Sequence, residues 1–298
     1  MDGVLLIDKP SGPTSHDVVA RLRSVTRERR IGHTGTLDPR ATGLLQLVLG
    51  KATRLASVLA GGDKTYEAAI RLGISTDTDD AEGHVVASAE DPPPDADDIR
   101  VALSRYQGTF EQVPPAHSAK KIGGEKAYAL ARRAEPVVLK PVAVTVRDLI
   151  VTAVAGDVVC ATLTVSSGFY VRSLARDLGR DLGCGAHLLE LRRTRVGTFH
   201  VADALPLADA EHLGPDVASH LVTPADALSD LPAVTVTAAG LRRAVHGNSL
   251  TPEHLERAWI PPAGSAGGGR IRVLGPDGQL VALAHSRGGF LHPAVVLG

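Results

Sequence analysis

The sequence predicts an α+β protein whose main domain is built on a mixed, mainly antiparallel sheet. Residues 64–73 and 142–166 alternate apolar and polar side chains and are rich in β-branched residues, which is typical of strands with one wet face. Residues 15–27 and 170–182 repeat apolar side chains at helical spacing. Because strands and helices are mixed in this way along one stretch of chain, we expect an α+β domain.

Further elements fit the same plan. The apolar run at residues 4–7 predicts a first buried strand, and residues 52–59 and 97–106 have helical periodicity. Residues 90–95 form an acidic, proline-rich segment that predicts a loop leading into the second of these helices.

The C-terminal part predicts a second, small and mostly β domain. A polar stretch with prolines near residues 205–230 is followed by strand-like alternation at residues 233–236. Residues 270–274 and 280–283 then form a predicted hairpin, joined through Gly275-Pro276-Asp277-Gly278. Since 298 residues are enough for one large core and an appended domain, we expect a large domain at 1–228 and a smaller one at 229–298.

Composition excludes several classes of protein. No run of about 18 apolar residues occurs, and the N-terminus does not resemble a signal peptide, so we expect a cytoplasmic protein that does not enter the membrane. The two cysteines, Cys160 and Cys184, are too few for a disulfide framework or a zinc site. The net charge of −1 does not by itself indicate a polyanionic partner.

One segment, at about 114–141, is strongly basic. Pro114-Pro115 opens it and Pro141 closes it. Between them lie the basic residues Lys120, Lys121, Lys126, Arg132, Arg133 and Lys140. The segment is either a mobile basic flap or a solvated loop and helix face, and its charge pattern fits both interpretations.

Three motif-like stretches do not carry the chemistry their spacing suggests. Residues 61–65 resemble a phosphate loop, but Asp63 stands where a glycine is needed and would repel phosphate. Residues 77–83 resemble a calcium loop, but Ala81 replaces a ligand, so a turn between strands is expected. The glycines at 179–185 follow a helix rather than a strand, which excludes a dinucleotide site.

The stretch at residues 32–45, GHTGTLDPRATGLL, presents a carboxylate in a glycine-framed loop. Asp38 is followed by a proline and then by an apolar segment. A rigidly presented carboxylate of this kind suits catalysis, although an aspartate that caps a helix N-terminus would have the same spacing.

This stretch resembles the hallmark motif of the TruB family of tRNA pseudouridine synthases. Further resemblances, in the family's order, are the N-terminal motif at residues 9–15, the tyrosine strand at 64–67, the RNA-gripping insertion from 114 to 132, the arginine motif at 167–174 and residues 183–193. His117 departs from the family, which usually has a tyrosine there. The tail from about 229 is similar to a PUA-type RNA-binding domain in strand pattern and position.

The resemblance assigns roles residue by residue. It implies that Asp38 is the catalytic aspartate, that Tyr66 stacks on the uracil and that Arg172 is the partner of Asp38. It also places the substrate-binding positions His33, Tyr170 and Leu191 around the flipped nucleotide. Candidates for contacts to the RNA backbone are Lys64, Lys120, Lys121, Lys126, Arg132, Arg192 and Arg193.

The implied reaction converts the T-loop uridine at position 55 of tRNA to pseudouridine. It breaks the bond from N1 to C1′ and joins C5 to C1′, so it is redox-neutral and implies no metal and no organic cofactor. Asp38 either adds to C1′ or stabilises an oxocarbenium or glycal-like species, and both routes stay open. Arg172 is expected to keep Asp38 ionised and oriented. The expected partner is the T-stem-loop of tRNA, and we expect a monomer.

Two alternatives to this function stay open. One is a related pseudouridine synthase acting on another RNA or on a site that a guide RNA selects. The other is an RNA-folding module for which catalysis is secondary.

Overall fold

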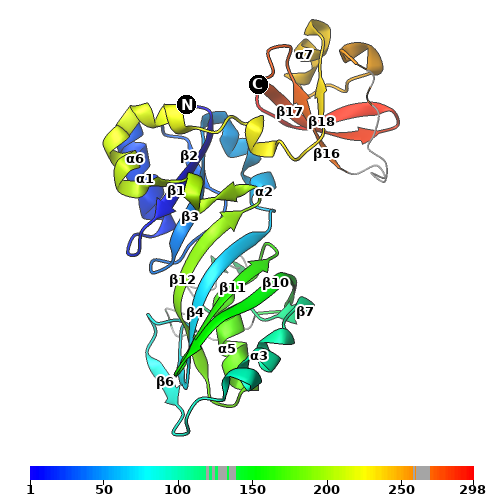
Figure 1. Ribbon diagram of the computed structural model, residues 1–298. Coiled ribbons are helices and arrows are strands. Elements are labelled where there is room, and N and C mark those ends of the chain that lie inside the picture. The colour runs from blue at the N-terminus through cyan, green and yellow to red at the C-terminus, as the bar shows by residue number, and fades with distance from the viewer. Residues whose placement is uncertain (119–120, 123–124, 127–132, 134–138, 258, 260–268) are drawn as a thin grey trace.

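The computed structural model describes residues 1–118, 121–122, 125–126, 133, 139–257, 259 and 269–298. A long main sheet and a small C-terminal sheet form separate parts of an elongated molecule (Figure 1). The strands of the main path, in spatial order, are β14 (Leu205–Pro206), β1 (Gly3–Lys9), β3 (Thr42–Leu49), β12 (Ala186–Val196), β4 (Lys64–Leu72), β11 (Val158–Val165), β10 (Val142–Ala155) and β7 (Gly108–Gln112). In addition, β2 (Ile31–His33) pairs with β3, and β13 (Phe199–His200) pairs with β12.

The sheet is mixed and mainly antiparallel, as predicted. Among its pairs, β1 with β14 and β3 with β12 are parallel. At the β3–β12 contact Gly43 lies opposite Arg193 with a positive φ of 97°, and a Cβ atom there would be 2.2 Å from the Arg193 carbonyl oxygen. Only glycine allows the two strands to approach so closely.

The central strand β12 brings together segments that are far apart in the sequence. Arg192 lies opposite Thr42 at the start of β3, while Arg193 on the other edge lies opposite Tyr66 of β4. The loop of residues 34–41 joins β2 to β3 and therefore ends beside β12 and β4. This topology places the predicted catalytic loop and the predicted tyrosine strand in the same part of the sheet.

Helices cover the sheet where the apolar patterns predict. The helix α1 (Ser15–Thr26) begins with a capping box in which Thr14 and Asp17 exchange hydrogen bonds. The helix α5 (Val171–Asp181) packs on β12 and buries Leu174 and Leu178. Near α5 and β10 lies α3 (Ala96–Ser104), which Asp95 caps.

Two segments differ from the prediction. The helix expected at 52–59 is a 3-10 turn, η1 (Gly50–Leu55), followed by the short α2 (Ala56–Leu59). The stretch near 205–230 is not only a linker, because α6 (Leu207–Leu213) and η3 (Gly214–His220) lie there and both pack against α1. Gly214, with a positive φ of 54°, and the proline after it end α6 early.

The C-terminal sheet has the predicted hairpin at its centre. It consists of β15 (Ala233–Thr235), β16 (Arg270–Leu274), β17 (Leu280–Arg287) and β18 (Phe290–Val296), with α7 (Ala238–Ala244) packed on it. Leu283 and Leu297 share a hydrophobic cluster with Val4 and Leu44 of the main sheet. The small domain is therefore held against the large one by a common apolar core.

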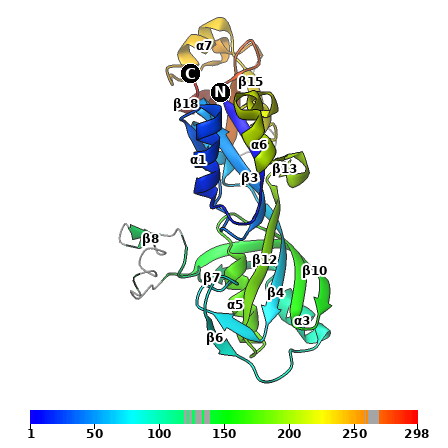
Figure 2. The ribbon, with the colours of Figure 1, turned by 90° about the vertical axis from the view of Figure 1, so that its left-hand side faces the viewer.

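The remaining elements are short. The hairpin of β5 (Ile74–Thr76) and β6 (Val85–Ser88) is joined through residues 77–84, which form the turn expected there. The other elements are β8 (Lys121–Ile122), β9 (Glu125–Lys126), η2 (Val201–Asp203), η4 (Asp226–Leu228) and η5 (Pro252–His254). In the predicted insertion, β8 stands away from the body of the main sheet (Figure 2). No helix among the described residues has both the length and the apolar character to cross a bilayer.

Candidate active site

Asp38 lies in the loop of residues 34–41, and its neighbours are fixed on both sides. Leu37 is 3% exposed, and its backbone exchanges two hydrogen bonds with the hydroxyl of Ser15, at 2.8 and 3.0 Å. The carbonyl oxygen of Pro39 accepts from the backbone nitrogen of Gly12 at 2.9 Å. Asp38 is therefore not a helix cap but a loop residue held between two anchored neighbours.

The N-terminal motif at residues 9–15 supports this loop. The side chain of Lys9 is fully buried, and its Nζ donates to the carbonyl oxygens of Pro10, Pro13 and Pro39 at 2.8 to 2.9 Å. Burial lowers the pKa of Lys9 to about 8, although Asp38 opposes this shift. Lys9 thus ties the start of α1 to the residue that follows Asp38.

Arg193 holds the other end of the loop. Its side chain is 1% exposed, and its guanidinium donates to the carbonyl oxygens of Gly35 and Leu44 at 3.0 and 2.8 Å. Thr34 is fixed separately, because its hydroxyl donates to Gln46 at 2.8 Å. The loop around Asp38 is therefore anchored at both ends by buried hydrogen bonds, an arrangement that fixes where its carboxylate lies.

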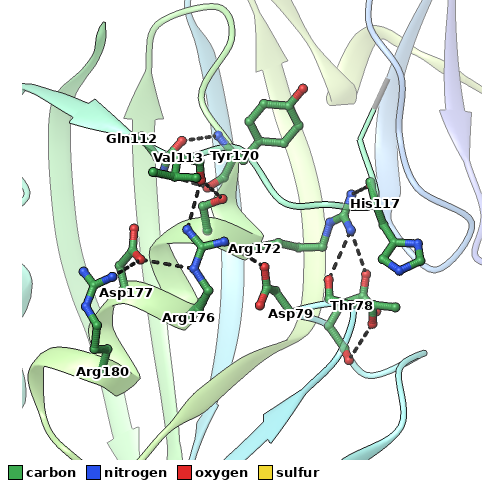
Figure 3. A network of polar contacts seen from close by, with 12 residues as sticks. Thr78, Asp79, Gln112, Val113, His117, Tyr170, Arg172, Arg176, Asp177 and Arg180 are labelled. Carbon is green, nitrogen blue, oxygen red and sulfur yellow. Dashed lines mark hydrogen bonds and ion pairs between the residues drawn. The ribbon is translucent and has the colours of Figure 1, made fainter. Parts of the chain in front are cut away.

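Arg172 is the ion-pair partner of Asp38. Its Nε lies 3.0 Å from Asp38 Oδ2, and its Nη1 lies 3.5 Å from Asp80 Oδ2. Nη1 also donates to the carbonyl oxygen of Thr78 at 3.2 Å, and Nη2 donates to that of His117 at 2.9 Å (Figure 3). The side chain of Arg172 is 7% exposed, whereas that of Asp38 is 41% exposed. The arginine is buried behind a carboxylate that a ligand can still reach.

The electrostatics of Asp38 result from opposing effects. Burial raises the pKa of Asp38 above its usual range and Asp80 adds to the rise, while Arg172 and Lys9 act in the other direction. The sequence led us to expect that Arg172 would favour the anion, and that contribution is present. The net shift is nevertheless upward, because the loss of solvation outweighs the attraction of the guanidinium.

A pocket opens beside this pair. Asp38, Asp80 and Arg172 lie on its wall, and Leu191 contributes an apolar surface from β12. The other residues lining it are Arg40, Ala41, Ala81, Glu82, Leu188, Leu189 and Glu190. The lining therefore combines apolar side chains with carboxylates and a guanidinium.

Tyr66 lies in β4, which pairs with β12, and His33 lies at the end of β2, which pairs with β3. Tyr66 is 7% exposed and belongs to the main hydrophobic core. His33 at the end of β2 stacks edge to face against His16, with ring centroids 6.1 Å apart. Burial lowers the pKa of His33, and His16 and Arg193 add to this, so the neutral imidazole is favoured.

Tyr170 immediately precedes α5 and is fixed through its backbone. Its nitrogen donates to the side-chain oxygen of Gln112 at 2.9 Å, and the amide of Gln112 donates back to its carbonyl oxygen at 3.0 Å (Figure 3). Burial raises the pKa of Tyr170, so its phenol stays protonated.

Known proteins share this combination of sequence and fold. The profile of the TruB family pseudouridylate synthase N-terminal domain matches residues 23–171, and that of the tRNA pseudouridylate synthase B C-terminal domain matches residues 172–228. The tRNA pseudouridine synthase B of Thermobifida fusca is 44% identical over 99% of this chain and 98% of its own. This chain belongs to the TruB family.

Other TruB family relatives and solved structures extend the comparison. The tRNA pseudouridine synthase B of Burkholderia mallei is 42% identical over 98% of this chain and 96% of its own. A chain in the crystal structure of a Cbf5-Nop10-Gar1 complex is 26% identical, with a TM-score of 0.76 over 99% of this chain and 85% of that one. A chain of an H/ACA RNP bound to a substrate RNA has a TM-score of 0.73 at 25% identity over 99% of this chain and 85% of its own. The predicted family and its fold are thus confirmed.

Two of the cations predicted to contact RNA phosphates, Lys64 and Arg193, have buried side chains. Lys64 is 8% exposed, and its ammonium donates to the carbonyl oxygens of Ala60 and Gly62 at 2.9 and 2.7 Å. Burial lowers the pKa of Lys64 to about 8. Arg193, as described above, donates to backbone oxygens of the loop that carries Asp38 and of β3. In this structure each side chain satisfies buried backbone oxygens and exposes little of its surface, so its contact with RNA phosphates stays a prediction.

Of the other cations predicted to contact the RNA backbone, the structure describes the side chain of Arg192 only. Arg192 is half-buried and forms a two-bond ion pair with Asp8 at 2.8 and 3.0 Å. Lys121 and Lys126 belong to β8 and β9, but their side chains lie outside the described part. Lys120 and Arg132 lie outside the described residues altogether.

Sequence reasoning missed the acidic turn at residues 77–83. Asp80 contacts Arg172, and Asp79 contacts Arg176 at 3.1 Å, so the stretch dismissed as a calcium loop helps to build the site. The signal was present as three carboxylates within four residues at 77–80, but the α5 partners of Asp79 and Asp80 lie almost a hundred residues later. In the described part of the chain, no cluster of His, Cys, Asp or Glu side chains could hold a metal ion.

Proposed function

We propose that this protein isomerises the T-loop uridine at position 55 of tRNA to pseudouridine, with Asp38 as the catalytic carboxylate. The observation that carries the proposal is the pair of a reachable Asp38 and a buried Arg172 at 3.0 Å, on the wall of a pocket. The 44% identical relative named tRNA pseudouridine synthase B supports tRNA as the substrate.

The reaction requires the target base to leave its stack. Extrusion costs a few kcal/mol, which contacts in the pocket must offset. In our proposal Tyr66 stacks on the uracil, Leu191 provides a second apolar surface, and His33 and Tyr170 lie near the flipped nucleotide. Asp38 then either adds to C1′ or stabilises the positive charge that develops there, and N1 departs from the sugar. After rotation of the base, C5 joins C1′ and loses its proton.

Binding of the folded RNA is proposed to involve three regions. The insertion at about 114–141 supplies cations for the phosphates, among them Lys120, Lys121, Lys126 and Arg132, and Arg192 adds one beside the site. The domain at 229–298 is proposed to be a PUA-like RNA-binding domain that acts in the same chain as the catalytic domain at 1–228. We further propose that the protein acts as a cytoplasmic monomer.

The test of the function is release of tritium from C5-labelled uridine in an unmodified tRNA transcript. We expect release from this transcript and none from one whose T-loop sequence is scrambled. Reverse-transcription mapping of modified uridines would then locate the product at position 55. Release from both transcripts, or from neither, would contradict the proposal.

A synthase acting on another RNA is the second candidate. The similarity to the chain of an H/ACA RNP bound to a substrate RNA favours it, with a TM-score of 0.73. In that case the purified chain alone would release no tritium from a tRNA transcript and would need added RNA or protein. The same assay therefore separates the two candidates.

Tyr66 offers a prediction about the last proton transfer. Tyr66→Phe keeps the stacking face, which is worth about 1–3 kcal/mol per base. If the phenol oxygen also helps to remove the C5 proton, as we propose, the Phe variant binds tRNA like the wild type but stalls before product release. Tyr66→Leu should lose both functions and also bind less tightly. Single-turnover kinetics with binding to the same tRNA measure this, and wild-type turnover by the Phe variant would leave stacking as the sole role.

A further inference from the structure

Arg176 lies one helical turn after Arg172 on α5 and outside the pocket. Its guanidinium makes three contacts: Nη1 lies 3.1 Å from Asp79 Oδ2, Nε lies 3.2 Å from Asp177 Oδ1, and Nη2 donates to the carbonyl oxygen of Val113 at 2.9 Å (Figure 3). The Arg176 side chain is 30% exposed, whereas those of Asp79 and Asp177 are 14% and 10% exposed. The charge of Arg176 is thus directed into the protein.

Arg172 and Arg176 form hydrogen bonds and ion pairs with the same two segments. The first is the acidic turn at residues 77–83, where Arg172 holds Thr78 and Asp80 and Arg176 holds Asp79. The second is the stem at residues 113–118, which leads into the basic insertion. There Arg172 holds the His117 carbonyl oxygen and Arg176 holds that of Val113. Residues four apart on a helix face the same way, so the pair forms two successive rungs between turn and stem.

The turn depends on this support. Asp79 has a left-handed backbone with φ of 62°, a conformation that few residues other than glycine, asparagine and aspartate adopt. Its backbone is tied to β12, because its carbonyl oxygen accepts from the nitrogen of Leu188 at 3.0 Å. The carboxylate of Asp79, however, is largely buried, so removing Arg176 would leave a buried charge without its partner.

The stem has a similar dependence. The carbonyl oxygen of Val113 accepts from Arg176 and from the hydroxyl of Ser173, both at 2.9 Å. Both donors lie on α5, and so does Arg172, which donates to the carbonyl oxygen of His117 further along the stem. The position of the stem relative to Arg172 is therefore set by α5 itself.

We propose that Arg176 is a positioning residue for catalysis, which holds the acidic turn and the stem in register so that Arg172 can orient Asp38. This inference rests on the proposed function but concerns a residue that does not line the pocket. Without Arg176 the turn moves away from its charge-neutralised position, and the acceptors that fix the plane of the Arg172 guanidinium move with it. Displacement of a catalytic group by about 1 Å can lower a rate by roughly 100-fold.

The experiment compares Arg176→Gln with wild type in single-turnover tritium release at saturating enzyme. We expect the rate constant to fall roughly 10- to 100-fold while the dissociation constant for the tRNA stays unchanged. Arg176→Lys keeps the charge for Asp79 but cannot also reach Val113, so an intermediate rate is expected. If circular dichroism shows that Arg176→Gln is unfolded, the single-turnover rate of Arg176→Lys tests the proposal instead.

The matched control is Arg180→Gln, one turn further along the same helix. Arg180 pairs with Asp177 at 3.0 Å and with Asp181 at 3.6 Å, is 68% exposed, and none of these contacts involves the turn or the stem. We expect Arg180→Gln to react at the wild-type rate. An equal loss in both variants would reduce the role of Arg176 to general support of α5 and overturn the proposal.

A double-mutant cycle with Asp79→Asn tests the route of the effect. Asparagine tolerates the left-handed backbone, so this change removes mainly the charge. If Arg176 acts through Asp79, the double variant should be about as slow as the slower single variant and not slower by the product of the two effects. Fully additive losses, or a wild-type rate for Arg176→Gln, would contradict the proposal. Absence of tritium release by the wild type would instead refute the proposed function.

Discussion

Asp38→Asn is expected to abolish pseudouridine formation while leaving tRNA binding nearly unchanged. Asparagine keeps the size of the side chain and can still contact Arg172, but its amide can neither add to C1′ nor stabilise a positive charge there. Loss of one member of a catalytic set commonly costs about four orders of magnitude or more in rate. Because Leu37 and Pro39 anchor the loop independently of the Asp38 side chain, the fold should be retained.

The measurement is single-turnover tritium release by Asp38→Asn, with filter binding to the same transcript. Asp63→Asn is a suitable control, since Asp63 pairs with Arg147 at 3.3 Å on the surface and is not among the residues lining the pocket. This control should react like the wild type. Product formed by Asp38→Asn at the wild-type rate would remove Asp38 from the mechanism.

Replacement of Arg172 should have the second-largest effect. Its guanidinium serves four acceptors, namely Asp38, Asp80 and the carbonyl oxygens of Thr78 and His117. Lysine at this position keeps the charge but cannot present a planar fork to all four, so Arg172→Lys should lower the rate by about 10²- to 10³-fold. Arg172→Gln removes the charge as well and should be slower still.

The two Arg172 variants are separated by their pH dependence. Catalysis needs Asp38 as the anion, so the rate falls as the pH drops through the pKa of Asp38. Burial already raises that pKa, and Arg172 lowers it. Removing the positive charge in Arg172→Gln therefore raises the pKa further, and the acid limb of the rate profile should move to higher pH. Arg172→Lys should leave the limb nearly in place. Identical limbs in wild type and Arg172→Gln would mean that Asp38 is not the titrating group.

Local sequence pattern was sufficient for most of the secondary structure. Alternation in β4, β10 and β11 and the helical spacing of α1 and α5 follow directly from which side chains must face the core. The failures lie at η1 with α2 and at α6 with η3. Gly214, with a positive φ, separates α6 from η3, and Gly50, also with a positive φ, opens η1. Their ends depend on packing against distant residues, which a local pattern does not contain.

For the charged residues, too, the sequence indicates some features, whereas others depend on contacts between distant segments. The motif around Asp38 and the arginine motif with Arg172 were recognised from sequence, and the fold brings them to 3.0 Å. Lys64 and Arg193 have the same composition signal as surface cations, yet both are buried on backbone carbonyl oxygens. A positive charge in a sequence does not reveal whether its acceptors are phosphates or the protein's own backbone.

By itself, then, the sequence determined the α+β class, the family, and the pairing of Asp38 with Arg172. The tertiary structure alone decided which cations are held by backbone carbonyl oxygens, that burial raises the pKa of Asp38, and that the acidic turn at 77–83 contacts Arg172. The physical reason is that hydrogen-bond partners and desolvation arise between segments such as β12, α5 and this turn, which meet only when the chain has folded.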